Sequence, residues 1–197
     1  MEPYFATHHI AGLILLVIVQ AWGVMELSQI SQERRSDGPV KVDGAAWRIT
    51  MIACLLATFG FPYLATHLVP SAQLRPGAVW CAVGIVILLG GLVLRGWSFK
   101  VLGEYFTHTV MVSSDQPVIA SGPYRVLRHP SYTGIILAAI GIGLASANWA
   151  DLAGLLLLTM TALLWRIRIE EAALLTTLGD RYRAYAAQHK RLVPLVW

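Results

Sequence analysis

Long apolar runs alternate with short polar connections along this chain, a pattern typical of helices that cross a membrane. A helix needs about 20 mostly apolar residues to cross roughly 30 Å of hydrocarbon. Three runs meet this requirement, from about His9 to Leu27, Ile49 to Val69 and Gly77 to Trp97. The first run has no basic segment before it and no small-residue cleavage site after it. We therefore expect a retained helix there, not a signal peptide.

Two shorter apolar runs follow, from Tyr132 to Ala147 and from Leu152 to Trp165, and residues 148–151, which include Asn148 and Asp151, separate them. Their brevity and the polar turn predict a tight helical hairpin. The first of the two is rich in small residues, which permit close approach between membrane helices: Gly134, Ala138, Ala139, Gly141, Gly143 and Ala145.

The pattern as a whole predicts an all-α fold, an integral membrane bundle of about five transmembrane helices followed by a cytoplasmic amphipathic helix. We expect a single domain over residues 1–197. Its first part, residues 1–99, would hold three of the helices. Its second part, residues 100–197, holds most of the polar residues and would carry any chemistry.

Composition supports a membrane protein. Of 197 residues, 56% are apolar and 13% are charged, against about 45–50% and about 25% in soluble domains. These values exclude disorder, a collagen-like repeat and a disulfide scaffold, and they argue against a large soluble enzyme. Cys54 and Cys81 lie within apolar runs without CxxC spacing, and the histidines are scattered. No metal site is therefore expected.

The basic residues predict an orientation in the membrane. All fifteen except Arg75 lie in or beside the first connection, the third connection or the carboxyl-terminal tail. The positive-inside rule then places the amino terminus outside, with the third connection and the carboxyl terminus in the cytoplasm. This distribution accounts for the net charge of +4 without a nucleic-acid partner. Anionic membrane lipids are the expected partners of this basic face.

One polar constellation precedes the hairpin, in the segment from Gly122 to Gly134. Pro130 suits the first turn of a helix, whose positive end can accept an anion such as a carboxylate. Basic and aromatic side chains surround it: Tyr124, Arg128, His129 and Tyr132. The tyrosines offer flat faces for a purine. The same residues equally suit a juxtamembrane anchor, with tyrosines at the interface and arginine on lipid phosphate.

A second constellation, residues 166–171, directly follows the last apolar run. Arg166 and Glu170 are four residues apart on a helix, in the less favourable order for intrahelical pairing. Because paired carboxylates at a membrane boundary are costly unless engaged, a functional site is a reasonable hypothesis. The alternative is a solvated helix face. An amphipathic stripe follows, interpreted as packing and interrupted by Gly179: Leu174, Leu178, Tyr182 and Tyr185.

The two constellations together resemble the isoprenylcysteine carboxyl methyltransferase family, within the wider group that includes phospholipid methyltransferases. Gly122-Pro-Tyr-Arg-Val-Leu-Arg-His-Pro-Ser-Tyr-Thr-Gly134 matches the family pattern GxYxxxRHPSYxG. The segment from Glu170 to Tyr185 fits EExxLxxxFGxxYxxY, and the segment from Gly103 to His108 is similar to the stretch ahead of the first motif. The resemblance covers roughly the carboxyl-terminal half.

This resemblance implies S-adenosylmethionine as cofactor, bound on the cytoplasmic side without a Rossmann fold. The implied cofactor contacts are Tyr124, His129, Pro130, Ser131, Tyr132 and Glu170, together with a lining stretch of Gln116, Pro117, Val118 and Ile119. Gln116 stands where animal members of the family carry histidine. Arg166 is implied to bind the substrate, with Arg128 in reserve.

The implied enzyme transfers a methyl group to the carboxylate of a lipophilic, prenylcysteine-like substrate that arrives from the bilayer. A carboxylate is ionised near pH 7, so this transfer needs positioning and no general base. A phospholipid N-methyltransferase would share the cofactor site but need a base, for which His108 and Glu104 are candidates. An NADPH-dependent sterol-type reductase is another alternative. Such reductases resemble a longer chain with more membrane segments, so a length of 197 residues argues against this class. A non-enzymatic membrane scaffold or transporter subunit is the remaining alternative.

Overall fold

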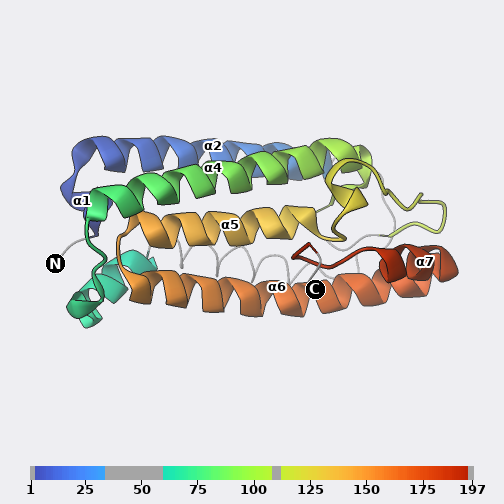
Figure 1. Ribbon diagram of the computed structural model, residues 1–197. Coiled ribbons are helices and arrows are strands. Elements are labelled where there is room, and N and C mark those ends of the chain that lie inside the picture. Colours follow the sequence, from blue (N-terminus) through green and yellow to red (C-terminus); the bar gives the residue numbers. More distant parts are fainter. Residues whose placement is uncertain (1–2, 34–59, 108–111, 195–197) are drawn as a thin grey trace.

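The computed structural model describes residues 3–33, 60–107 and 112–194, and within these ranges the fold is a bundle of roughly parallel and antiparallel helices (Figure 1). The long helices are α2 (His9–Glu33), α4 (Gly77–Leu102), α5 (Pro130–Ala145) and α6 (Trp149–Leu178). α4 packs against both α2 and α5, and α5 packs against α6. The shorter elements are α1 (Tyr4–Thr7), η1 (Pro70–Ala72), η2 (Gly103–Tyr105), η3 (Gly122–Arg125) and α7 (Asp180–Gln188).

Within the described residues, three helices are long and apolar enough to cross a membrane, over His9–Gln29, Gly77–Tyr105 and Trp149–Leu178. Large apolar side chains on their outer faces are exposed. The exposed fraction is 70% for Val93 and 71% for Leu157. Such faces are suited to lipid, and the chain is an integral membrane protein. The second predicted run lies largely outside the described residues, although residues 60–68 are helical.

The predicted hairpin is present, but its second arm is longer than the apolar run. The Asn148 side chain accepts hydrogen bonds from the amides of Ala150 (2.9 Å) and Asp151 (3.3 Å), so α6 begins at Trp149. No glycine or proline follows the apolar run until Gly179, whose φ of 57° ends the helix. The charged residues after Trp165 therefore extend the same helix, which carries them beyond the apolar run.

The small residues of α5 contact α4 at backbone distance, as predicted. A Cβ on Gly91 would lie 2.6 Å from the carbonyl oxygen of Gly134, and a Cβ on Gly134 would lie 2.6 Å from that of Gly91. The contact continues along both helices, where a Cβ on Gly141 of α5 would lie 2.6 Å from the amide nitrogen of Leu88 of α4. Only glycine permits this separation, so these positions fix how closely α5 lies against α4.

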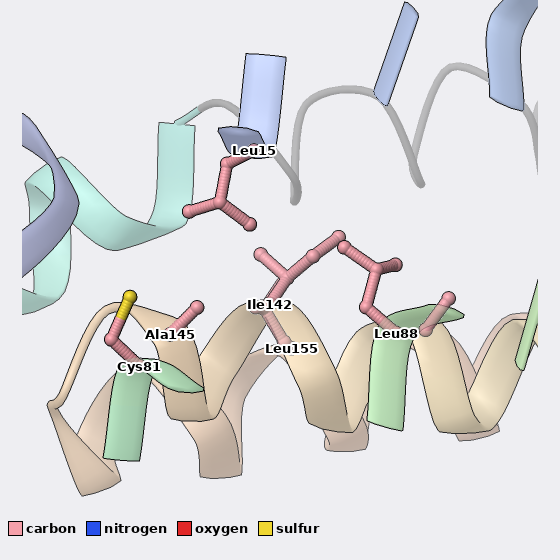
Figure 2. Close-up of a cluster of buried hydrophobic side chains, with 7 residues drawn as sticks. Leu15, Cys81, Leu88, Ile142, Ala145 and Leu155 are labelled. Atoms are coloured by element: carbon pink, nitrogen blue, oxygen red, sulfur yellow. The ribbon is translucent and has the colours of Figure 1, made fainter. Parts of the chain in front are cut away.

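A small apolar core surrounds this contact (Figure 2). Leu88 of α4, Ile142 of α5 and Leu155 of α6 point toward one another, and Leu15 of α2 covers them. Cys81 belongs to the same cluster as a buried free thiol. Cys54 lies outside the described residues.

A buried ion pair connects α2, α4 and the start of α5. Arg95 is only 4% exposed, and its Nε and Nη2 donate to the two carboxylate oxygens of Glu26 at 2.5 and 2.8 Å. Its Nη1 donates to Ser131 Oγ at 2.6 Å. Breaking a buried pair leaves an uncompensated charge, at a cost of about 3–5 kcal/mol. The sequence pattern counts Arg95 among the basic residues in or beside the third connection, whereas the structure buries its side chain between helices.

The adjacent residues Gly90 and Gly91 allow a matched test of the α4–α5 contact. Gly91→Ala should lower the free energy of unfolding by about 1–3 kcal/mol, because its Cβ overlaps the backbone of α5. A Cβ on Gly90 meets nothing within 4 Å, so Gly90→Ala should be neutral or stabilising by up to about 1 kcal/mol. Unfolding of both variants in detergent measures the difference, and equal losses would contradict the packing described.

Candidate functional site

A cavity opens at the end of the bundle where η3, the first turn of α5, the second half of α6 and α7 meet (Figure 1). Residues 102–107 and 112–119 contribute the rest of its wall. The empty volume is about 870 Å³, open solvent at the mouth included.

All of the site residues predicted from sequence except Pro130 line this one cavity. They are Gln116, Pro117, Val118, Ile119, Tyr124, Arg128, His129, Ser131, Tyr132, Arg166 and Glu170. Pro130 is the first residue of α5 and is fully buried. Its fixed φ suits a helix start, so it shapes the wall without reaching the cavity.

Tyr132 joins the two predicted constellations. Its hydroxyl donates to Glu170 Oε2 at 2.5 Å and accepts from Arg166 Nε at 2.7 Å. Tyr132 lies in the first turn of α5, whereas Arg166 and Glu170 lie one turn apart on α6. The Arg166 side chain is nearly buried, so its position is set by the protein and its charge is presented at the cavity wall.

Glu171 faces a different set of groups, all of them cations or hydrogen-bond donors. Its Oε1 lies 2.6 Å from Arg128 Nη1 and 3.3 Å from His129 Nε2. Its Oε2 lies 2.9 Å from Arg191 Nη2 and 3.0 Å from Arg191 Nε. Two arginines therefore share one carboxylate, and the cluster is positive overall.

Glu171 and Arg191 were not among the site residues predicted from sequence. The adjacent pair of glutamates was a usable signal for Glu171, because two carboxylates at a membrane edge both need partners. Arg191 lies in a tail without a motif, and nothing local indicates that it reaches Glu171.

The tail itself crosses the start of α5. The amides of Arg128 and His129 donate to the carbonyls of Lys190 (2.7 Å) and Arg191 (3.0 Å). The Thr133 hydroxyl donates to the carbonyl of Leu192 at 2.8 Å, and the amides of Tyr132 and Thr133 donate to the carbonyl of His129. The protein thus supplies acceptors for these four amides, of which those of Tyr132 and Thr133 belong to the first turn of α5.

The amphipathic stripe after Glu171 forms packing, as predicted. Leu178, Tyr182 and Tyr185 are buried together, and Leu174 packs against them. The Tyr185 hydroxyl donates to the carbonyls of Tyr124 (2.8 Å) and Leu127 (3.3 Å), and burial raises the pKa of Tyr185 to about 12. The same helix places Tyr182 and Tyr185 in the cavity wall. No group of three metal-ligating side chains occurs in the ranges that the structure describes.

Fold and site together define an integral membrane helical bundle with a polar, aromatic-lined cavity at one end. The family model described as the isoprenylcysteine carboxyl methyltransferase (ICMT) family matches residues 82–176. The match begins within α4 and ends within α6, so it includes η3 and the first turn of α5. The resemblance inferred from the two motifs is confirmed.

Individual relatives agree with the family match. The chain is 30% identical over 121 residues to the probable protein-S-isoprenylcysteine O-methyltransferase of Oryza sativa subsp. indica, which covers 58% of this chain and 61% of the relative. It is 33% identical over 118 residues to the protein-S-isoprenylcysteine O-methyltransferase of Xenopus laevis, covering 58% of this chain and 40% of that one. The chain therefore spans less than two thirds of these relatives.

A solved structure shares the fold over more of the chain. It is described as the eukaryotic intramembrane Ras methyltransferase ICMT without a monobody, and it superposes with a TM-score of 0.60 at 25% identity. The alignment covers 79% of this chain and 55% of that structure. The uncharacterized protein YpbQ of Bacillus subtilis is 25% identical over 163 residues, covering 82% of this chain and 94% of that protein.

The Glu171 cluster allows a test of what holds the site together. Glu171→Gln should lower the free energy of unfolding by about 3 kcal/mol, because Arg128 and Arg191 lose their common counter-charge. Asp180→Asn is the control, since Asp180 pairs with Arg183 at the surface and its loss should cost at most about 1 kcal/mol. Denaturant unfolding in detergent measures both, and an indifferent Glu171→Gln would contradict the role of the cluster.

Proposed function

We propose that this protein is an S-adenosylmethionine-dependent methyltransferase that esterifies the carboxylate of a lipophilic, prenylcysteine-like molecule. The observation that carries the proposal is the meeting of Tyr132, Arg166 and Glu170 at the wall of one cavity. The names of the relatives support the same reaction class.

The wall suits a ligand with both aromatic and charged parts. Tyr105, Phe106 and Tyr124 supply aromatic surface, and the Glu170 carboxylate, which retains partial exposure, supplies negative charge. S-adenosylmethionine carries a purine, a ribose, a sulfonium and an amino acid, so these residues fit it. When bound, it supplies an electrophilic methyl group. Glu170 would hold its ribose hydroxyls or amino group, and the tyrosines would flank the purine.

Arg166 would hold the acceptor carboxylate. Its Nε is committed to Tyr132, which orients the planar guanidinium, and guanidinium binds carboxylate with two parallel hydrogen bonds. An ionised carboxylate is already nucleophilic, so the protein has to align it and exclude water. Because the ester that forms is neutral, binding by Arg166 weakens as the reaction proceeds, and this favours release of the product.

The geometry offers less to an amine acceptor. A protonated amine has to lose a proton before methylation, so the site would need a base. Glu104 is exposed and does not line the cavity, and His108 lies outside the described residues. The Arg166 guanidinium would also repel an ammonium group.

We place this chemistry at the cytoplasmic face of the membrane, with the amino terminus outside, on the distribution of basic residues. The acceptor would enter from the bilayer with its hydrocarbon chain still in lipid. Membrane lipids are the other expected partners, and no nucleic acid is involved.

Arg166→Ala tests the role in the acceptor site. With a farnesylated N-acetylcysteine as acceptor, kcat/KM for methyl ester formation should fall about 100-fold, the loss of a charged hydrogen-bonded pair. The affinity for S-adenosylhomocysteine should change less than about threefold. Arg168→Ala is the matched control, because Arg168 is exposed on the same helix, and it should retain activity.

Glu170→Ala should show the opposite pattern, with weakened S-adenosylhomocysteine binding. The function proposed would be wrong if the parent protein bound no S-adenosylhomocysteine in detergent, or if it methylated only an amine lipid such as phosphatidylethanolamine. Full turnover by Arg166→Ala would remove the role given to this residue.

A further inference from the structure

Two neighbouring residues of the cavity wall, Tyr182 and Arg128, each have a buried polar atom that lacks a well-formed hydrogen bond within the residues that the structure describes. These atoms are the Tyr182 hydroxyl and Arg128 Nε, and neither reaches solvent. Both residues line the cavity. A buried donor without an acceptor costs about 1–3 kcal/mol, so a pair of them beside a cavity indicates where a ligand atom belongs.

The hydroxyls of two other tyrosines in the cavity wall, Tyr185 and Tyr132, have partners within the protein. Tyr185, three residues further along α7, donates to two backbone carbonyls. Tyr132 has both Glu170 and Arg166. Arg128 itself uses Nη1 for Glu171, which anchors the guanidinium without engaging Nε. Tyr182 therefore differs from Tyr185 in that its hydroxyl donates to no group within the described residues. The sequence pattern predicts packing for both residues.

The chemistry of the two donors selects the ligand. Arginine Nε only donates. Burial and the charges of Glu171 and Glu170 raise the pKa of Tyr182 well above its ordinary value, whereas the charge of Arg128 and its side-chain interaction with the phenol oxygen lower it. The phenol stays protonated, and because arginine can only donate to it, the phenol O–H remains a donor. The adjacent cluster of Arg128, Arg191 and Glu171 is positive overall. Two donors beside net positive charge favour a carboxylate.

The reaction proposed above involves two carboxylates, that of the acceptor and that of the amino-acid end of the methyl donor. Arg166 and Arg128 lie on different elements and are tied to different glutamates, Arg166 to Glu170 through Tyr132 and Arg128 to Glu171 directly. Each arginine is thus available to one carboxylate. If both carboxylates bound the same arginine, their two negative charges would lie close together.

Building on the proposed function, we infer that Tyr182 and Arg128 form a subsite for the carboxylate at the amino-acid end of the methyl donor. Arg128 supplies charge and one donor, and Tyr182 supplies the second donor. This assigns Arg128 to the donor and leaves the acceptor to Arg166.

Two ligands that differ only in the amino-acid end test this assignment. S-adenosylhomocysteine carries the carboxylate, whereas 5′-methylthioadenosine lacks the whole amino-acid group. Calorimetric titration of the full chain in detergent should show that Tyr182→Phe weakens S-adenosylhomocysteine about tenfold and 5′-methylthioadenosine less than about twofold. Arg128→Lys, which retains the charge opposite Glu171 but removes Nε, should change the ratio of the two affinities in the same direction.

Tyr185→Phe is the matched control on the same helix. Its hydroxyl satisfies backbone carbonyls, so this variant should lower the unfolding temperature and leave the ratio of affinities unchanged. Tyr182→Phe removes a hydroxyl that donates to no group within the described residues, so its unfolding temperature without ligand should stay the same or rise.

An unchanged ratio in Tyr182→Phe overturns the subsite, whether both ligands weaken equally or neither does. A drop in the unfolding temperature of ligand-free Tyr182→Phe with no change in the ratio does so too, because the residue is then structural. If the parent protein binds S-adenosylhomocysteine and forms methyl ester while the ratio stays unchanged, the subsite alone fails. If the parent protein binds neither ligand, the proposed function fails with it.

Discussion

The carboxylate of Glu171 holds together three segments that are far apart in the sequence. Arg128 precedes α5, Glu171 lies on α6 and Arg191 lies in the tail after α7, and the two guanidiniums meet on the one carboxylate. Their mutual repulsion is tolerable only while that negative charge is present. The tail then supplies the carbonyls that pair with the amides at the α5 start, so the walls of the cavity depend on this shared carboxylate.

A second constraint sets where the α5 start lies. Gly91 and Gly134 bring the backbones of α4 and α5 together, and this proximity lets Arg95 reach both Glu26 and Ser131. The buried ion pair therefore depends on the close packing of α4 against α5. The positions of the cavity residues of α5 depend on both. The amino-terminal helix α2 is connected to the start of α5 through this ion pair.

The fold class and most of the cavity could be predicted because their signals are local. Apolar runs, the small residues of α5 and two motifs of fixed spacing are all readable within about 15 residues. The length of α6 was underestimated, since charge at a membrane edge does not end a helix and Gly179 does. Arg95 and Arg191 gave no such signal, because their significance depends on partners 69 and 20 residues away. Tyr182 belongs to the second motif, but the pattern alone does not separate it from the packing residue Tyr185, because the difference lies in their hydrogen bonds.

The sixteen residues of α5 have a consequence for the depth of the cavity. At about 1.5 Å per residue the helix measures roughly 24 Å, less than the roughly 30 Å of hydrocarbon. Trp149, 55% exposed, follows α5 directly and is a residue type that anchors at the headgroup level. With Trp149 at that level, the opposite end of α5 would lie several ångströms below the far headgroups. A molecule with a hydrocarbon tail could present its polar end at this depth while its tail stays in the same leaflet.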